Sequence, residues 1–179
     1  MTGGAAGRPL RQLPTLAALL EHIAAAGSLD GAILLGSFAE GTPDAASDLD
    51  LIVCVGEGHF ATAWQDRAAM RVTGAMAWWD QDLVPDRMGA HKWITDDLVL
   101  VECLLADRDS GVRLATPHRV VVGDPDLAGR FIARPPIKPA ELGGDVHPVE
   151  RAYDQLKRVI RNHGPDRAAP CPGSHGRPP

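Results

Sequence analysis

The chain has 179 residues, which suits one domain and leaves little room for a second. Hydrophobic residues make up 45% of it, and no apolar run reaches the roughly 18 residues that a membrane-spanning helix needs. The net charge is −5, so no overall basic field draws the chain to nucleic acid. Residues 1–13 lack the apolar core of a secretory signal, and Cys54 and Cys103 lie in apolar runs that favour buried, reduced thiols. We therefore expect a cytoplasmic protein without membrane contact.

The first half of the chain predicts a helix, two strands and a second helix. Apolar residues recur at helical spacing over 14–26 and a glycine follows, as at a helix end. The apolar runs 32–35 and 49–55 are short and also end at glycine, which favours buried strands. A polar connection of small residues separates them. Another helix is predicted between Gly58 and Gly74.

The second half predicts further strands and a last helix. Residues 75–79 form a candidate strand, and 91–95 with 98–105 resemble a hairpin closed by acidic turn residues. A short strand is predicted at 120–122, and an amphipathic helix over 149–160. This order of elements predicts an α/β fold with a small mixed sheet flanked by helices, plus one C-terminal helix.

The same pattern gives the domain boundaries. We expect the sheet domain over 1–142 and the C-terminal helix within 143–164. The Pro-rich run 134–139 predicts an extended connection. Proline is also concentrated in 165–179, where the composition predicts a disordered tail.

The candidate functional residues are concentrated around the connection between the first two predicted strands. Asp48 and Asp50 are two residues apart at the start of a strand, so strand geometry places both carboxylates on one face. Two like charges this close are costly without a cation between them, and hard oxygen ligands suit Mg²⁺. Gly36-Ser37 ends the preceding strand, where backbone N–H groups and a hydroxyl can meet phosphate oxygens. Taken alone, an Asp-x-Asp at a strand edge can also be a turn residue followed by a solvated one.

The combination resembles the nucleotidyltransferase superfamily with the DNA polymerase β-type palm. Its pattern is a hydrophobic residue, Gly-Ser, about ten residues, and Asp-hydrophobic-Asp, which Gly36-Ser37 and Asp48-Leu49-Asp50 match. The sequence of this segment is most similar to a small prokaryotic branch of the superfamily, which includes minimal nucleotidyltransferases and antibiotic adenylyltransferases. The specific match covers about 20 residues of this chain. Many small relatives have an arginine where this chain has Glu40, so no phosphate contact is carried over to that position.

The resemblance implies a palm-like fold, a nucleoside triphosphate such as ATP as substrate, and two Mg²⁺ ions. By resemblance, Asp48 and Asp50 hold Mg²⁺, and Gly36 and Ser37 bind the triphosphate. The family also uses a third carboxylate from a later strand. Glu102 is the leading candidate, because it interrupts an apolar run and an acid there needs a metal or a buried base as partner.

Glu102 could instead lie at the sheet margin, facing solvent or pairing with an arginine. Asp97 and Asp80 are then the next candidates for the third carboxylate. If Glu102 does belong to the site, its part is to ligate the metal or to accept the proton of the acceptor.

The resemblance further implies an enzyme that transfers a nucleoside monophosphate, AMP from ATP in the first instance, to an acceptor hydroxyl with release of pyrophosphate. The acceptor is a small molecule such as an antibiotic. One alternative is a protein acceptor, as in minimal nucleotidyltransferases that modify a partner toxin. Another is a catalytically inactive nucleotide-binding or interaction module. The apolar stripe of the 149–160 helix could dock a second copy or a partner protein, or could pack on its own domain.

Overall fold

The computed structural model describes residues 10–134 and 147–163, and close contacts group the chain into two units, Met1–Leu142 and Gly143–Pro179. A six-stranded sheet in the order β3-β4-β5-β2-β1-β7 forms the first unit's centre. β2 and β5 run parallel, whereas the other neighbouring strands run antiparallel. The strands are β1 (Leu29–Leu34), β2 (Leu49–Val55), β3 (Ala77–Val84), β4 (Met88–Ile94), β5 (Leu100–Ala106) and β7 (Arg119–Val122). The predicted mixed sheet is confirmed.

Helices cover one face of the sheet. These are α1 (Gln12–Ala25), α3 (Phe60–Asp66) and the 3-10 helix η1 (Arg67–Met70). Leu19 and Ile23 of α1 are buried in one core cluster with Leu34, Leu51 and other strand residues. Burial of these side chains supplies the main favourable contribution to folding.

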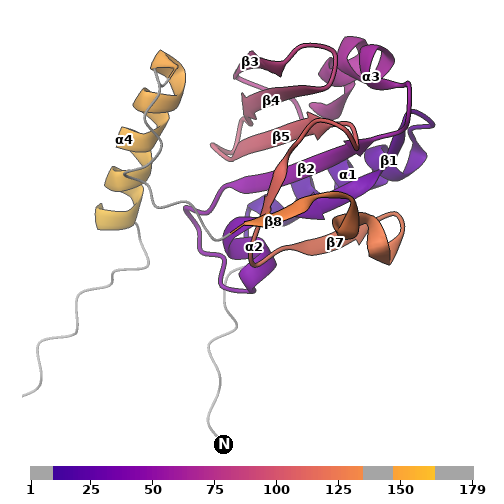
Figure 1. The fold of residues 1–179 in the computed structure, drawn as a ribbon. Coiled ribbons are helices and arrows are strands. Elements are labelled where there is room, and N and C mark those ends of the chain that lie inside the picture. Colours follow the sequence, from indigo (N-terminus) through magenta and orange to yellow (C-terminus); the bar gives the residue numbers. More distant parts are fainter. Residues whose placement is uncertain (1–9, 135–146, 164–179) are drawn as a thin grey trace, which may run out of the picture. The chain divides into compact units, whose positions relative to one another are not determined.

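The opposite face is covered by the segment that follows β5. It contains β6 (Arg113–Ala115), the 3-10 helix η2 (Pro125–Arg130) and β8 (Ile132–Arg134), with β6 and β8 paired in parallel. Leu114 and Leu127 pack there against Ile33 and Ile52. Figure 1 shows α1 and β8 on opposite sides of the sheet. This second core also includes Cys54 of β2 and Ala106 of β5, whereas Asp50 and Glu102 are not among its members.

Several elements differ from those predicted. β3 runs on through Asp80 and Asp82 to Val84 and pairs with β4, because an edge strand tolerates polar residues that interrupt the apolar pattern. Gly36–Glu40 forms a short helix, α2, in a segment predicted as a connection. β6 and β8 were not predicted, since three residues are too few for a periodic signal. The predicted pairing of 91–95 with 98–105 is confirmed.

In the second unit, α4 spans Pro148–His163, as the stripe over 149–160 predicts. Leu156 is exposed on this helix and Tyr153 is buried. A contact between α4 and a second copy or partner stays a prediction. Within the described ranges, none of the helices combines the length and apolar character that crossing a membrane requires. The predicted tail over 165–179 and residues 135–139 of the extended connection lie outside the described residues.

Candidate functional site

The two halves of the motif meet at the ends of β1 and β2. The backbone N–H of Leu35, the residue after β1, donates to the carbonyl oxygen of Asp50 at 2.9 Å. Gly36 has a φ of +59°, and a Cβ atom there would lie 3.0 Å from Oδ2 of Asp50. Glycine therefore serves both the backbone conformation and the close approach of the carboxylate. Ser37 follows as the second residue of α2.

The loop that leads into β2 is held by hydrogen bonds. Oδ1 of Asp44 accepts from the backbone N–H of Ala46 at 2.9 Å and from the hydroxyl of Ser47 at 2.8 Å. The fully buried Gln12 of α1 donates its side-chain amide to the carbonyl oxygens of Ser47, at 2.8 Å, and of Asp44, at 3.0 Å. These bonds fix the residues immediately before Asp48 on the end of α1.

Asp48 and Asp50 flank a buried core residue. Asp48 lies one position before β2, is half-buried, and has its Oδ1 atom shielded from solvent. Leu49 and Leu51 pack into the core on the helix-covered face. Because side chains alternate along a strand, Asp50 lies on the opposite face of the sheet. Asp50 itself is half-buried.

Glu102 and Lys92 continue a row of residues across the sheet from Asp50. Asp50 is aligned with Glu102 on β5, Glu102 with Lys92 on β4, and Lys92 with Trp79 on β3. Nζ of Lys92 lies 2.9 Å from Oε2 of Glu102. The Lys92 side chain is only 8% exposed and that of Glu102 is 35% exposed. The predicted third carboxylate thus lies beside Asp50 and is paired with a lysine.

The other acidic candidates lie elsewhere. Asp97 is exposed in the turn between β4 and β5. Asp80 aligns with His91, the neighbour of Lys92, and so lies on the helix-covered face. Oδ1 of Asp80 is 2.6 Å from Nδ1 of His91, and Oδ2 is 3.0 Å from Nη2 of Arg67.

This cluster shifts the pKa values of both titratable partners. Burial raises the pKa of Asp80, but hydrogen bonds from Arg67 and His91 outweigh it and give a net lowering. Burial lowers the pKa of His91, and the hydrogen bond to Asp80 opposes this only in part. His91 is therefore neutral at pH 7, and the bond assigns its proton to Nδ1. Burial also raises the pKa of Cys54, to about 12, and that of Cys103, so both thiols are protonated as expected.

Sequence reasoning missed Lys92 and Gln12. The sequence does contain a signal for Lys92, because a charged residue between His91 and Trp93 in a predicted strand is unusual and needs a partner. Gln12 carried no comparable signal, because its partners are backbone carbonyl groups more than 30 residues away.

The donor chemistry of Asp48 and Asp50 fits Mg²⁺, which prefers carboxylate oxygens and completes its shell with phosphates and water. The Asp50 carboxylate lies against the glycine turn, where a side chain would crowd it. In residues 10–134 and 147–163, no three His, Cys, Asp or Glu side chains gather closely enough to form a ready-made metal centre.

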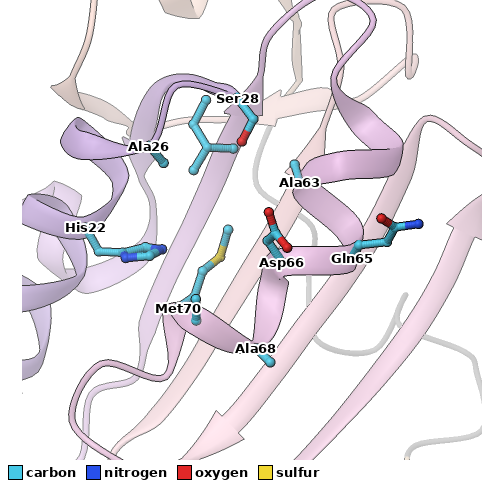
Figure 2. A pocket seen from close by; sticks show the side chains of 10 residues that line it. His22, Ala26, Ser28, Ala63, Gln65, Asp66, Ala68 and Met70 are labelled. Carbon is cyan, nitrogen blue, oxygen red and sulfur yellow. The ribbon is translucent and has the colours of Figure 1, made fainter.

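A separate pocket lies on the helix-covered side of the molecule. Its volume is about 410 Å³, and it opens between α1 and the α3–η1 segment (Figure 2). Its lining includes His22, Ser28, Asp66 and Met70. None of the predicted site residues lines this pocket.

Neither protein-family models nor curated proteins match this sequence. Among solved structures, the chain is similar to a cytoplasmic RNA terminal U-transferase, with a TM-score of 0.33 and 20% sequence identity. The match covers 54% of this chain and 27% of that protein's chain, so it spans about a quarter of the longer protein.

Proposed function

We propose that this protein is a nucleotidyltransferase that transfers a nucleoside monophosphate, AMP from ATP in the first instance, to an acceptor hydroxyl. The acceptor oxygen forms a bond to the α-phosphorus, the bond from that phosphorus to the bridging oxygen breaks, and pyrophosphate leaves. The hydroxyl proton passes to a base. The supporting observation is the contact between the Gly36 turn and the Asp50 carboxylate, which joins the Gly-Ser and Asp-x-Asp parts of the motif.

Asp48 and Asp50 would hold Mg²⁺, and Gly36 and Ser37 would meet the triphosphate. When bound, the ion would neutralise charge on the phosphates and on the reacting oxygens. The protein's own contribution is to hold two carboxylates on a rigid strand end. Hydrogen bonds from Gln12 fix the loop on one side of them, and the Leu35–Asp50 backbone bond fixes the turn on the other.

Glu102 has two possible parts in this proposal. It would complete the metal site, or it would accept the proton of the acceptor hydroxyl. Its position directly beside Asp50 on the neighbouring strand suits either part. A small-molecule hydroxyl, such as that of an antibiotic, is the proposed acceptor, and a protein hydroxyl is the alternative.

The proposal is tested by metal-dependent nucleotide binding. A ligand that binds the folded state raises its melting temperature, so Mg²⁺ and ATP together should stabilise the protein more than either alone. Replacing both site carboxylates, as Asp48→Asn with Asp50→Asn, should abolish the difference. The matched control is Asp124→Asn with Asp126→Asn, an exposed Asp-x-Asp pair at the start of η2, which should keep it.

Transfer itself is measured with labelled ATP, Mg²⁺ and small hydroxyl compounds, and then with protein acceptors. Label should move to an acceptor in the wild type and the control pair, and not in the Asp48/Asp50 variant. An unchanged melting shift in that variant would remove the assigned nucleotide site. Binding without transfer to any acceptor would instead support the inactive nucleotide-binding module.

A further inference from the structure

We propose that Lys92 is a cationic member of this site and takes the place of a second divalent ion, so that the site binds one divalent cation. The inference rests on the proposed function, because it concerns the metal content of the same site. It assigns Glu102 to holding Lys92 rather than to holding a metal.

The position of Lys92 carries the first step. Backbone register, not a flexible side chain, places Lys92 next to Glu102 and two strands from Asp50. The 2.9 Å contact to Oε2 of Glu102 is the distance of a charge-assisted hydrogen bond. With 92% of its side chain covered, Lys92 is held far more firmly than a lysine on an open surface.

The charges of the row give the second step. A buried ammonium group is costly without a carboxylate partner, and Glu102 supplies one. Asp48 adds a third carboxylate to the two of the row, so three carboxylates and one ammonium group leave two negative charges, which a single divalent ion neutralises. A second divalent ion beside Glu102 would have to displace Lys92 or lie close to its positive charge, and like charges at such distances repel strongly in a partly buried site.

The chemistry of an ammonium group gives the third step. A divalent ion in a nucleotide-transfer site neutralises charge on reacting oxygens. Lysine supplies a positive point charge with three N–H donors and needs no set of coordinating ligands. Pairing with Glu102 places that charge in the row that contains Asp50. Lys92 can therefore provide a fixed charge there without a metal.

The number of bound metal ions tests the inference. The probe is Mn²⁺ alone, titrated into the full chain and followed by electron paramagnetic resonance. We expect one Mn²⁺ per chain in the wild type. Lys92→Gln frees Glu102 and should bind a second Mn²⁺, whereas Lys92→Arg keeps the charge and should bind one. Lys157→Gln on α4 is the control for the loss of a lysine charge and should also bind one.

Glu102→Gln gives an independent readout. If Glu102 holds Lys92, its neutral variant should bind the single Mn²⁺ with an affinity within about threefold of the wild type. If Glu102 is a metal ligand, the affinity should fall at least about tenfold, the scale for losing a group that tunes a metal site. If Lys92→Gln does not fold, Glu102→Gln and Lys92→Arg still test the inference.

The outcomes separate the two proposals. The role of Lys92 would be overturned by any of three results. These are two bound Mn²⁺ ions in the wild type, only one bound Mn²⁺ in a folded Lys92→Gln variant, or a tenfold lower Mn²⁺ affinity in Glu102→Gln. The proposed nucleotide site would survive any of these results as long as Asp48→Asn with Asp50→Asn loses Mn²⁺. Undiminished Mn²⁺ binding in that double variant would overturn both.

Discussion

Asp50 and Glu102 lie directly opposite each other on β2 and β5, the parallel pair in the middle of the sheet. Neighbouring strands are about 4.8 Å apart, so this register brings together two carboxylates from distant parts of the chain. A shift of one residue in the pairing would turn Glu102 toward the helices. The register of one strand pair therefore determines whether a third acidic residue reaches the candidate site.

The first prediction concerns Gly36. Gly36→Ala places a Cβ 3.0 Å from Oδ2 of Asp50 and puts an L-residue at a φ of +59°. The backbone strain should lower the free energy of unfolding by about 1–2 kcal/mol. The crowded carboxylate should also lower the extra melting shift that Mg²⁺ and ATP give together. Thermal melts with and without ligands measure both effects.

Gly111→Ala is the matched control for this change. Gly111 has a φ of +72° and no atom within 4 Å of the added Cβ, so it carries the strain without the contact. It should lose similar stability and keep the full ligand shift. Equal ligand shifts in the two variants would show that the Gly36–Asp50 contact does not matter for binding.

The sequence predicts much of the site because its signals are local. Gly36 is required by its own backbone conformation, and Asp48 and Asp50 are positioned by the alternation of one strand. Glu102 is conspicuous as an acid in an apolar run. All four signals can be seen without knowing which strands are neighbours, and the mixed sheet follows from the order of the elements.

The remaining features depend on exact strand register or on contacts between distant segments. The sequence predicts the hairpin of β4 and β5, but the ion pair of Lys92 with Glu102 depends on the exact register of that hairpin, which the apolar pattern does not fix. Gln12 depends on a distant contact, because its partners lie in the loop before β2. β6 and β8 are stabilised by packing of Leu114 on the sheet rather than by a pattern of their own.

The second prediction concerns Gln12. Gln12→Met keeps the length of the side chain and removes the donor to the carbonyl oxygens of Asp44 and Ser47. Leaving the carbonyl oxygen of Ser47 without this buried donor should cost about 1–3 kcal/mol. Because the loop precedes Asp48, Mn²⁺ affinity should fall as well. Gln65→Met, an exposed change on α3, should alter neither urea unfolding nor Mn²⁺ binding. A destabilised Gln12→Met with normal Mn²⁺ affinity would limit Gln12 to a structural part.

The third prediction concerns pH. Burial lowers the pKa of His91 below its ordinary value of 6.5, so the unfolded chain takes up this proton before the folded chain does as the pH falls. The free energy of unfolding should therefore decrease as the pH falls below 6.5, until His91 is protonated in the folded state too. The lowered pKa of Asp80 acts in the same direction, but only below 3.8.

His91→Gln removes the titrating ring and keeps a side-chain N–H that can donate to Asp80. Urea unfolding between about pH 5.5 and 7.5 should show a flatter pH dependence in this variant than in the wild type. His59→Gln, at an exposed position before α3, should keep the wild-type slope. An identical slope in His91→Gln would mean that another group governs stability in this range.

The last prediction separates binding from chemistry at Glu102. Glu102→Gln keeps the shape of the side chain and removes its charge, while Asp48 and Asp50 remain to hold the metal and its triphosphate. Mg²⁺–ATP binding should be nearly intact, and transfer to the acceptor should fall about 10²–10⁴-fold, because the variant loses either the base for the acceptor proton or the carboxylate that holds Lys92. Melting shifts measure the first quantity and single-turnover transfer of labelled ATP the second. Glu57→Gln, at a side chain that is 84% exposed, should change neither. Near-normal transfer by Glu102→Gln would reduce the Lys92–Glu102 pair to a structural contact at the sheet margin, where a small change in stability is the only effect.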